Sequence, residues 1–154
     1  IDSVIHDQIR QIKHSIKTDN EYFDAVVNAK LAVCENLDIK VRTRIMNSSL
    51  KKLTHSEIAS LFGNLFDNAI EASKDSKYKR IDLDVQLQRG YLSISMKNSI
   101  DRSVLKENEC LTTTKKEKEY HGLGTKNIRR LVEKKGGIII YFEEDGYFVC
   151  DILI

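Results

Sequence analysis

The sequence predicts an α+β fold, a two-layer sandwich in which a mixed sheet of about five strands carries three helices on one face. Two hairpins are indicated where apolar segments flank short turns, at Arg89-Gly90 and at Asp145-Gly146. A further strand is expected over residues 39–45, where apolar residues alternate with polar ones. Segments with helical apolar spacing lie between these strands and supply the predicted helices of the α+β fold.

Composition and charge restrict the class of protein. The chain has 154 residues, of which 41% are hydrophobic and 31% charged, as in an ordinary soluble domain. The net charge of +2 gives no reason to expect a nucleic-acid partner. Cys34, Cys110 and Cys150 match no zinc pattern, and their odd number favours a reducing compartment. No apolar run is long enough to span a bilayer, no signal peptide is recognisable, and the first residue is Ile, so we expect a fragment.

Two helical segments are predicted before the first strand. The first carries a narrow apolar seam, which is typical of the end of a helix that packs on a partner helix, although an ordinary core-facing helix gives the same pattern. The seam consists of Ile5, Ile9, Ile12 and Ile16. The second helix runs roughly from Asn20 to Asn36. One side of it carries Phe23, Val26, Val27, Lys30, Leu31 and Cys34.

A third helix is predicted from the capping box Thr54–Glu57 to about Ser73. One arc of its helical wheel is apolar, with Ile58, Leu61, Phe62, Leu65, Phe66 and Ala69. The opposite arc is rich in oxygen atoms, with Glu57, Ser60, Asn64, Asp67, Asn68 and Glu71. This arc has no Lys or Arg before Lys74, which suits a hard cation such as Mg²⁺. A plain solvated helix face is the alternative interpretation.

A polar loop and a glycine-rich helix start follow the first hairpin. Residues 99–120 lose all apolar periodicity, and a loop of this length inside a domain is often functional. We expect residues 101–120 to act as a mobile lid. Gly122 and Gly124 come just before a helix predicted from Thr125, where unpaired N–H groups favour a phosphate. Lys115 and Lys116 are close enough in sequence to reach the same anion.

These motifs together resemble the ATP-binding domain of the GHKL superfamily, the Bergerat fold. "GNLFDNAIEA" is similar to its N box, and "HGLGTKNI" resembles its last glycine box. With "DAVVNAKLAVCENLDIKV", "KNS" and "TTKKEKEYHGLGTKNI", the chain resembles sensor histidine kinases of the Agr-type quorum-sensing group over roughly residues 20–154.

The resemblance implies ATP and Mg²⁺ as cofactors and assigns a role to each matching position. Asn68 is implied as the Mg²⁺ ligand, and Asn64, one turn earlier, as facing the phosphates; both are the implied catalytic residues. The implied ATP-binding set is Asn64, Asn68, Asn98, Thr114, Lys115, His121, Gly122, Leu123 and Gly124. Hydrolysing relatives usually carry Glu at the position of Asn64, and an amide cannot act as a general base, which favours transfer over hydrolysis. For His121, a cap or a surface position is the alternative.

The adenine pocket departs from the superfamily pattern. The usual Asp of a DxGxG motif is replaced by Asn98 in "MKNSID", which has no glycine. The carbonyl of Asn98 can still accept a hydrogen bond from the adenine amino group, but without charge assistance, so a weaker affinity is expected.

The resemblance implies the catalytic domain of a sensor histidine kinase, residues 19–154, preceded at 1–18 by the end of a dimerisation helix. Its expected partners are the dimerisation and phosphoacceptor domain of the same kinase and a response-regulator receiver, in the cytoplasmic portion of a membrane-anchored homodimer. His6 and His14 lie too close to the domain to be the acceptor, because no room remains for a second dimerisation helix. The alternatives are a degenerate GHKL domain that acts as a phosphotransfer or docking scaffold without kinase activity, and a serine kinase that acts as an anti-sigma factor.

Overall fold

The computed structural model describes residues 15–107 and 121–154. Five strands form one sheet in the order β1-β2-β3-β5-β4, in which β1 is parallel to β2 and every other neighbouring pair is antiparallel. The strands are β1 Lys40–Ile45, β2 Arg80–Gln88, β3 Tyr91–Ser99, β4 Ile138–Glu144 and β5 Tyr147–Leu153. The mixed five-stranded sheet predicted from the sequence is confirmed.

The two hairpins owe their tight turns to residues with positive φ. Arg89 and Gly90 have φ of 53° and 84°, and Asp145 and Gly146 have φ of 51° and 80°. Two consecutive residues of this kind are the signature of a type I′ turn, whose twist matches that of the flanking strands. The turns therefore fix the register of β2 on β3 and of β4 on β5.

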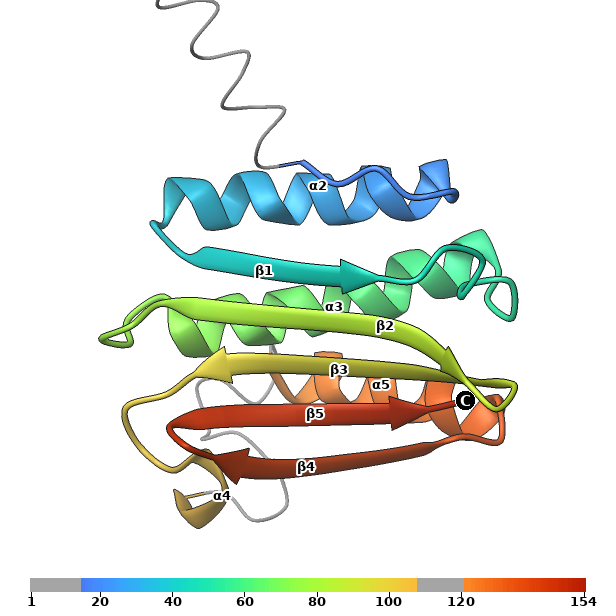
Figure 1. The fold of residues 1–154 in the computed structure, drawn as a ribbon. Helices are drawn as coiled ribbons and strands as arrows, with labels where there is room; N and C mark the ends of the chain where they lie inside the picture. The colour runs from blue at the N-terminus through green and yellow to red at the C-terminus, as the bar shows by residue number, and fades with distance from the viewer. Residues whose placement is uncertain (1–14, 108–120) are drawn as a thin grey trace, which may run out of the picture.

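The helices cover one face of the sheet, and α3 and α5 lie behind it in Figure 1. They are α2 Glu21–Asn36, α3 His55–Ser73 and α5 His121–Lys134, while the short α4 Val104–Glu107 lies apart from them near the end of β4. The other face carries ion pairs between neighbouring strands, such as Arg42 with Asp82 and Arg44 with Asp84. One face is therefore buried and one is charged, which confirms the two-layer sandwich. None of the helices described is long and apolar enough to cross a bilayer.

The central helix α3 forms as its sequence predicts. Thr54 accepts a hydrogen bond from the backbone N–H of Glu57, and Glu57 accepts one from the N–H of Thr54, so the capping box is confirmed. The predicted apolar arc is buried against the sheet and against α2, where Phe62 meets Phe23 edge to face with ring centroids 4.8 Å apart. This packing fixes the rotation of α3 and so decides which way its polar arc faces.

The linker before α2 differs from the predicted helix. Residues 15–18 are not helical, and Ile16 packs against the domain core instead of extending the seam. The side-chain amide of Asn28 accepts from the N–H of Ile16 at 2.7 Å and donates to its carbonyl at 3.1 Å. Since these two bonds take up both polar groups of the Ile16 backbone, a helix through this residue is disfavoured. Ile5, Ile9 and Ile12 lie outside the described residues.

The polar region after β3 is more ordered at its start than expected. The backbone N–H groups of Val104 and Leu105, at the start of α4, donate to the carboxylate of Glu143 on β4, as does the hydroxyl of Ser103 at 2.6 Å. A carboxylate at a helix start satisfies donors that have no partner in the helix itself. The predicted loop is therefore anchored to the sheet at this end, while residues 108–120 lie outside the described part.

Candidate functional site

The two amides of α3 face the start of α5. Asn64 and Asn68 are one helical turn apart, and both are half-buried. A Cβ atom added to Gly124 would stand 3.2 Å from Oδ1 of Asn68 and 3.4 Å from Oδ1 of Asn64. The structure thus brings together three predicted site residues from separate motifs, and Gly124 is bare because a side chain would meet these oxygens.

The start of α5 lies earlier than predicted. The helix begins at His121, so Gly122 and Gly124 belong to its first turn rather than to a preceding loop. The first four N–H groups of any helix have no partner within the helix, so the backbone donors at Gly122, Leu123 and Gly124 still suit an anion. The structure does not describe the side chain of His121, and Thr114 and Lys115 lie outside the described residues.

The acidic residues of α3 form ion pairs with lysines. The sequence pattern of α3 did not predict these pairs. Lys30 of α2 contacts Asp67 at 2.6 Å, and Lys135, which follows α5, contacts Glu57 at 2.7 Å. Glu71 pairs with Lys74 of its own helix at 2.9 Å. The predicted stripe without cations is therefore wrong as a description of the folded surface, and Lys30 belongs to an ion pair rather than to the apolar side of α2. The amides, not the carboxylates, remain as ligand candidates.

Asn98 joins the amides at a small cavity between α3, α5 and the sheet. It is buried on β3, and its Nδ2 donates to the carbonyl of Ser99 at 3.3 Å. No hydrogen bond to its Oδ1 occurs within residues 15–107 and 121–154, so this oxygen is available as an acceptor. Asn68 and Asn98 both line the cavity, whose volume is about 30 Å³. This is room for a water-sized group only, since ligand pockets usually measure about 300–1,000 Å³.

The cavity also has aromatic and sulfur-containing walls that sequence reasoning did not identify. Tyr141 and Phe148 stack with centroids 5.7 Å apart, and both line the cavity with Cys150. The hydroxyl of Tyr141 is buried without a well-formed hydrogen bond among the described residues. Burial raises the pKa of the Cys150 thiol to about 12, so it is a neutral wall rather than a nucleophile. Their strand pattern predicted only core packing, and no local signal separates a core aromatic from a pocket aromatic.

The donor set of this site suits a magnesium ion that arrives with a phosphate ligand. Among the described residues, no group of three or more His, Cys, Asp or Glu side chains is placed to hold a metal. Mg²⁺ typically takes one or two protein oxygens and completes its shell with phosphate and water. The Oδ1 of Asn68, which the bare Gly124 leaves uncovered, fits such a partial ligand set.

A helix-covered mixed sheet with an N-box amide pair beside a glycine-rich helix start defines the Bergerat class of α+β sandwich. Residues 53–154 match the family model described as the GHKL domain. This match spans more than half of the chain, which therefore belongs to the GHKL family.

The structural comparisons agree with this fold. The nucleotide-free catalytic domain of the histidine kinase ThkA is similar with a TM-score of 0.69 and 20% identity, over 90% of this chain and 92% of that one. The histidine kinase AdeS of Acinetobacter baumannii gives a TM-score of 0.62 and 16% identity, over 99% and 77% of the two chains. Full-length ShkA, in complex with AMPPNP, gives 0.61 and 14%, over 89% and 31%. No curated protein sequence matches the chain.

Proposed function

We propose that this chain is the ATP-binding catalytic domain of a sensor histidine kinase, which transfers the γ-phosphate of ATP to a histidine on a separate dimerisation domain in two-component signalling. The observation that carries the proposal is the approach of Gly124 to Asn64 and Asn68. It joins the two motifs that GHKL proteins use for the metal and the phosphates, although they lie on different helices. The ATP analogue bound by the structurally similar ShkA supports the same ligand class.

Each residue has a role that follows from its position. The N–H groups of Gly122, Leu123 and Gly124 point along the start of α5 and bind phosphate oxygens. Asn68 supplies an amide oxygen to Mg²⁺, which when bound neutralises phosphate charge. The Oδ1 of Asn98 accepts from the adenine amino group at the other end of the cavity. Thr114, Lys115 and His121 are retained as further ATP-binding candidates from the motif resemblance.

The site favours phosphate transfer over hydrolysis. A hydrolase needs a base to activate water, and the amide of Asn64 cannot accept a proton at neutral pH. Two carboxylates of the same helix, Asp67 and Glu57, are engaged by lysines. A nucleophile brought by another domain, such as a histidine, is therefore the acceptor that this site suits.

The wider setting follows from the motif resemblance. We infer that residues 19–154 form the catalytic domain and that residues 1–18 connect it to a dimerisation helix. From the same resemblance we infer a kinase of the Agr-type quorum-sensing group, in a membrane-anchored homodimer with this part in the cytoplasm. A response-regulator receiver then takes the phosphate from the dimerisation domain.

The test is nucleotide binding by the whole chain with and without Mg²⁺, followed by incubation with a separately supplied dimerisation fragment and γ-labelled ATP. We expect binding in the range of tens of micromolar or weaker, because the adenine bond lacks charge assistance and each such bond contributes about 1 kcal/mol or more. Label is expected on the added fragment and not on His6 or His14. Acid-labile phosphate on either of these two histidines would overturn the assignment of the acceptor.

Base selectivity tests the role of Asn98 separately. Guanine presents a carbonyl where adenine presents its amino group, so the acceptor Oδ1 of Asn98 favours ATP over GTP. The Asn98→Ala variant should bind ATP more weakly and remove this preference without unfolding the chain. Equal binding of ATP and GTP by the unaltered chain would contradict the adenine role.

A scaffold without kinase activity is the second candidate function. The small volume of the cavity favours it, since about 30 Å³ does not hold a nucleotide base without movement of the walls. The two candidates differ in one measurement: a scaffold binds neither ATP nor its analogues at any Mg²⁺ concentration, whereas a kinase domain opens the cavity on binding.

A further inference from the structure

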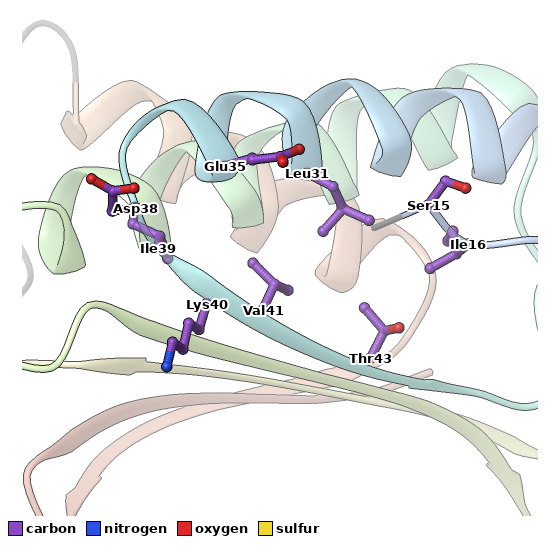
Figure 2. Close-up of a pocket in the computed structure, with 9 residues that line it drawn as sticks. All are labelled: Ser15, Ile16, Leu31, Glu35, Asp38, Ile39, Lys40, Val41 and Thr43. Carbon is purple, nitrogen blue, oxygen red and sulfur yellow. The ribbon is translucent and has the colours of Figure 1, made fainter. Parts of the chain in front are cut away.

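A second and larger hollow lies at the edge of the sheet, between α2 and β1 (Figure 2). This groove has a volume of about 500 Å³. Leu31 and Val41 point toward one another across it, and Thr43 points into it from further along β1. It is therefore partly apolar, it borders an edge strand, and no residue of the candidate nucleotide site lines it.

The backbone of β1 has a free hydrogen-bonding edge toward this groove. The N–H groups of Lys40 and Met46 donate to β2-side carbonyls, at Lys79 and Val85. Since successive residues of a strand alternate, the even-numbered amides of β1 face β2 and the odd-numbered ones face outward. The N–H groups of Val41 and Thr43 have no partner among the described residues. An edge of this kind is a template for one more strand.

The chain itself arrives at one end of the groove. Ser15 and Ile16 line the end near Thr43, and Asn28 holds the backbone of Ile16 there through two hydrogen bonds. From Ile16 the chain runs on to the start of α2 at Glu21. The described part of the chain therefore begins, at Ser15, in the lining of the groove.

The end of the groove near the start of β1 is acidic. Glu35 and Asp38 line it near the start of β1, and Glu35 is exposed. The segment upstream of Ser15 carries Arg10 and Lys13, with Ile12 between them. Five residues of extended chain span about 17 Å, at about 3.3 Å each, which is the length of the β1 edge over residues 39–43. Arg10 can thus reach the acidic end when Ile16 stays where it is.

We propose that residues 10–14 of this chain bind in the groove as a sixth strand, parallel to β1. The direction follows from the fixed end, because a segment that begins near Asp38 and ends at Ser15 runs the same way as β1. With the side chain of Ile16 directed at the core, alternation directs Ile12 toward the apolar wall of the groove and Arg10 toward Glu35. The backbone of the segment pairs with the outward N–H and C=O groups of Val41 and Thr43.

Docking of this segment excludes a continuous helix through the same residues. A dimerisation helix that ended at the domain would withdraw residues 10–14 from the groove, so the two arrangements compete for one segment. The position of the catalytic domain relative to its dimerisation domain would then depend on which arrangement prevails. The inference does not depend on nucleotide binding, because no residue of the proposed ATP site takes part.

Amide hydrogen exchange on the full chain, resolved by residue, tests the proposal. Docking should slow exchange at Val41 and Thr43, whereas Arg42 and Arg44, which face β2, are slow in any case. In the Ile12→Asp variant the two outward amides should exchange about tenfold faster or more, with Arg42 and Arg44 unchanged. Ile5→Asp is the matched control and should leave all four amides as they are, because Ile5 lies beyond the groove.

A charge exchange tests the register independently. Glu35→Lys should speed exchange at Val41, and adding Arg10→Glu to it should restore the slow rate, while Arg10→Glu alone should also speed exchange. Fast exchange at Val41 and Thr43 in the unaltered chain overturns the proposal. Protection that increases over about a tenfold rise in protein concentration also overturns it, since a second copy would then be the occupant.

Discussion

The polar arc of α3 carries two kinds of side chain that end in different environments. Glu57, Asp67 and Glu71 are each bound to a lysine, two of which come from other elements. Asn64 and Asn68 have no such partner and face the bare backbone at Gly124. The difference teaches that formal charge is a poor guide to the ligand-binding residues here. Two of the carboxylates attach α3 to neighbouring elements, and the neutral amides are left for a ligand.

The largest effect on ATP binding is expected from a substitution of one of the two amides. Asn68→Ala removes the oxygen assigned to Mg²⁺, so ATP should bind equally with and without the metal, and at least about tenfold more weakly than in the unaltered chain with Mg²⁺. Isothermal titration at several Mg²⁺ concentrations measures this. Asp67→Asn is the control on the neighbouring position and should keep the metal dependence. If Asp67→Asn loses it instead, the acids and not the amides form the site.

The next effect concerns the space between the two helices. Gly124→Ala places a methyl group 3.2 Å from Oδ1 of Asn68, which crowds the oxygen and should reduce ATP affinity about tenfold. Stability should change little, because the helix propensity of alanine offsets the contact by about 1 kcal/mol.

Gly63 supplies the matched control for this substitution. It lies within α3, and an added Cβ would have no neighbour within 4 Å. Gly63→Ala should therefore raise the free energy of unfolding by about 0.5–1 kcal/mol and leave ATP affinity unchanged. Equal affinities in the two alanine variants would show that Gly124 serves helix packing alone.

A smaller effect, on stability, is expected when the ion pair between α2 and α3 is removed. The pair of Lys30 with Asp67 is partly exposed, with 53% of the Asp67 side chain accessible, so Lys30→Met should lower the free energy of unfolding by less than about 1 kcal/mol. Chemical denaturation of the variant measures it. A loss of several kcal/mol would mean that this pair holds the two helices together, in place of the contact between Phe23 and Phe62.

The smallest expected effect is on how the stability of the fold depends on pH. The hydrogen bond from Lys135 and the bond from the backbone of Thr54 hold the pKa of Glu57 below its ordinary value of 4.5. A lowered pKa in the folded chain stabilises it at pH above 4.5, and this contribution is lost as the pH falls through the lower, folded value. Melting temperatures between neutral pH and about pH 3 should therefore fall slightly less in Glu57→Gln than in the unaltered chain. A steeper fall in the variant would contradict this assignment.

Local patterns were sufficient to predict the parts of the fold that local forces decide. The capping box at Thr54, the apolar arc of α3 and the two turns with Arg89-Gly90 and Asp145-Gly146 are all contained in short stretches of sequence. Asn64, Asn68 and Gly124 were found because each belongs to a recognisable motif. Their mutual distance, however, comes from the packing of α5 on α3.

The predictions that the structure corrects depend on contacts between elements that are distant in sequence. No pattern near Asp67 reveals that Lys30 will reach it, and no pattern near Glu57 reveals Lys135. Ile16 continued a helical spacing that the amide of Asn28 overrides. Tyr141 could not be recognised as a cavity wall from the sequence. In a strand, an aromatic residue that packs in the core and one that lines a pocket follow the same alternation of apolar and polar residues.

The two hydrogen bonds of Asn28 to Ile16 also have a mechanical consequence. Tension on the chain upstream of Ile16 is borne by the side chain of Asn28, in the middle of α2, rather than by the end of that helix. From α2 it passes to α3 through the packing of the two helices, which includes the rings of Phe23 and Phe62 and the ion pair of Lys30 with Asp67. Asp67 is the residue directly before Asn68. A pull at the N-terminal linker is thus transmitted through α2 to the turn of α3 that carries the amides.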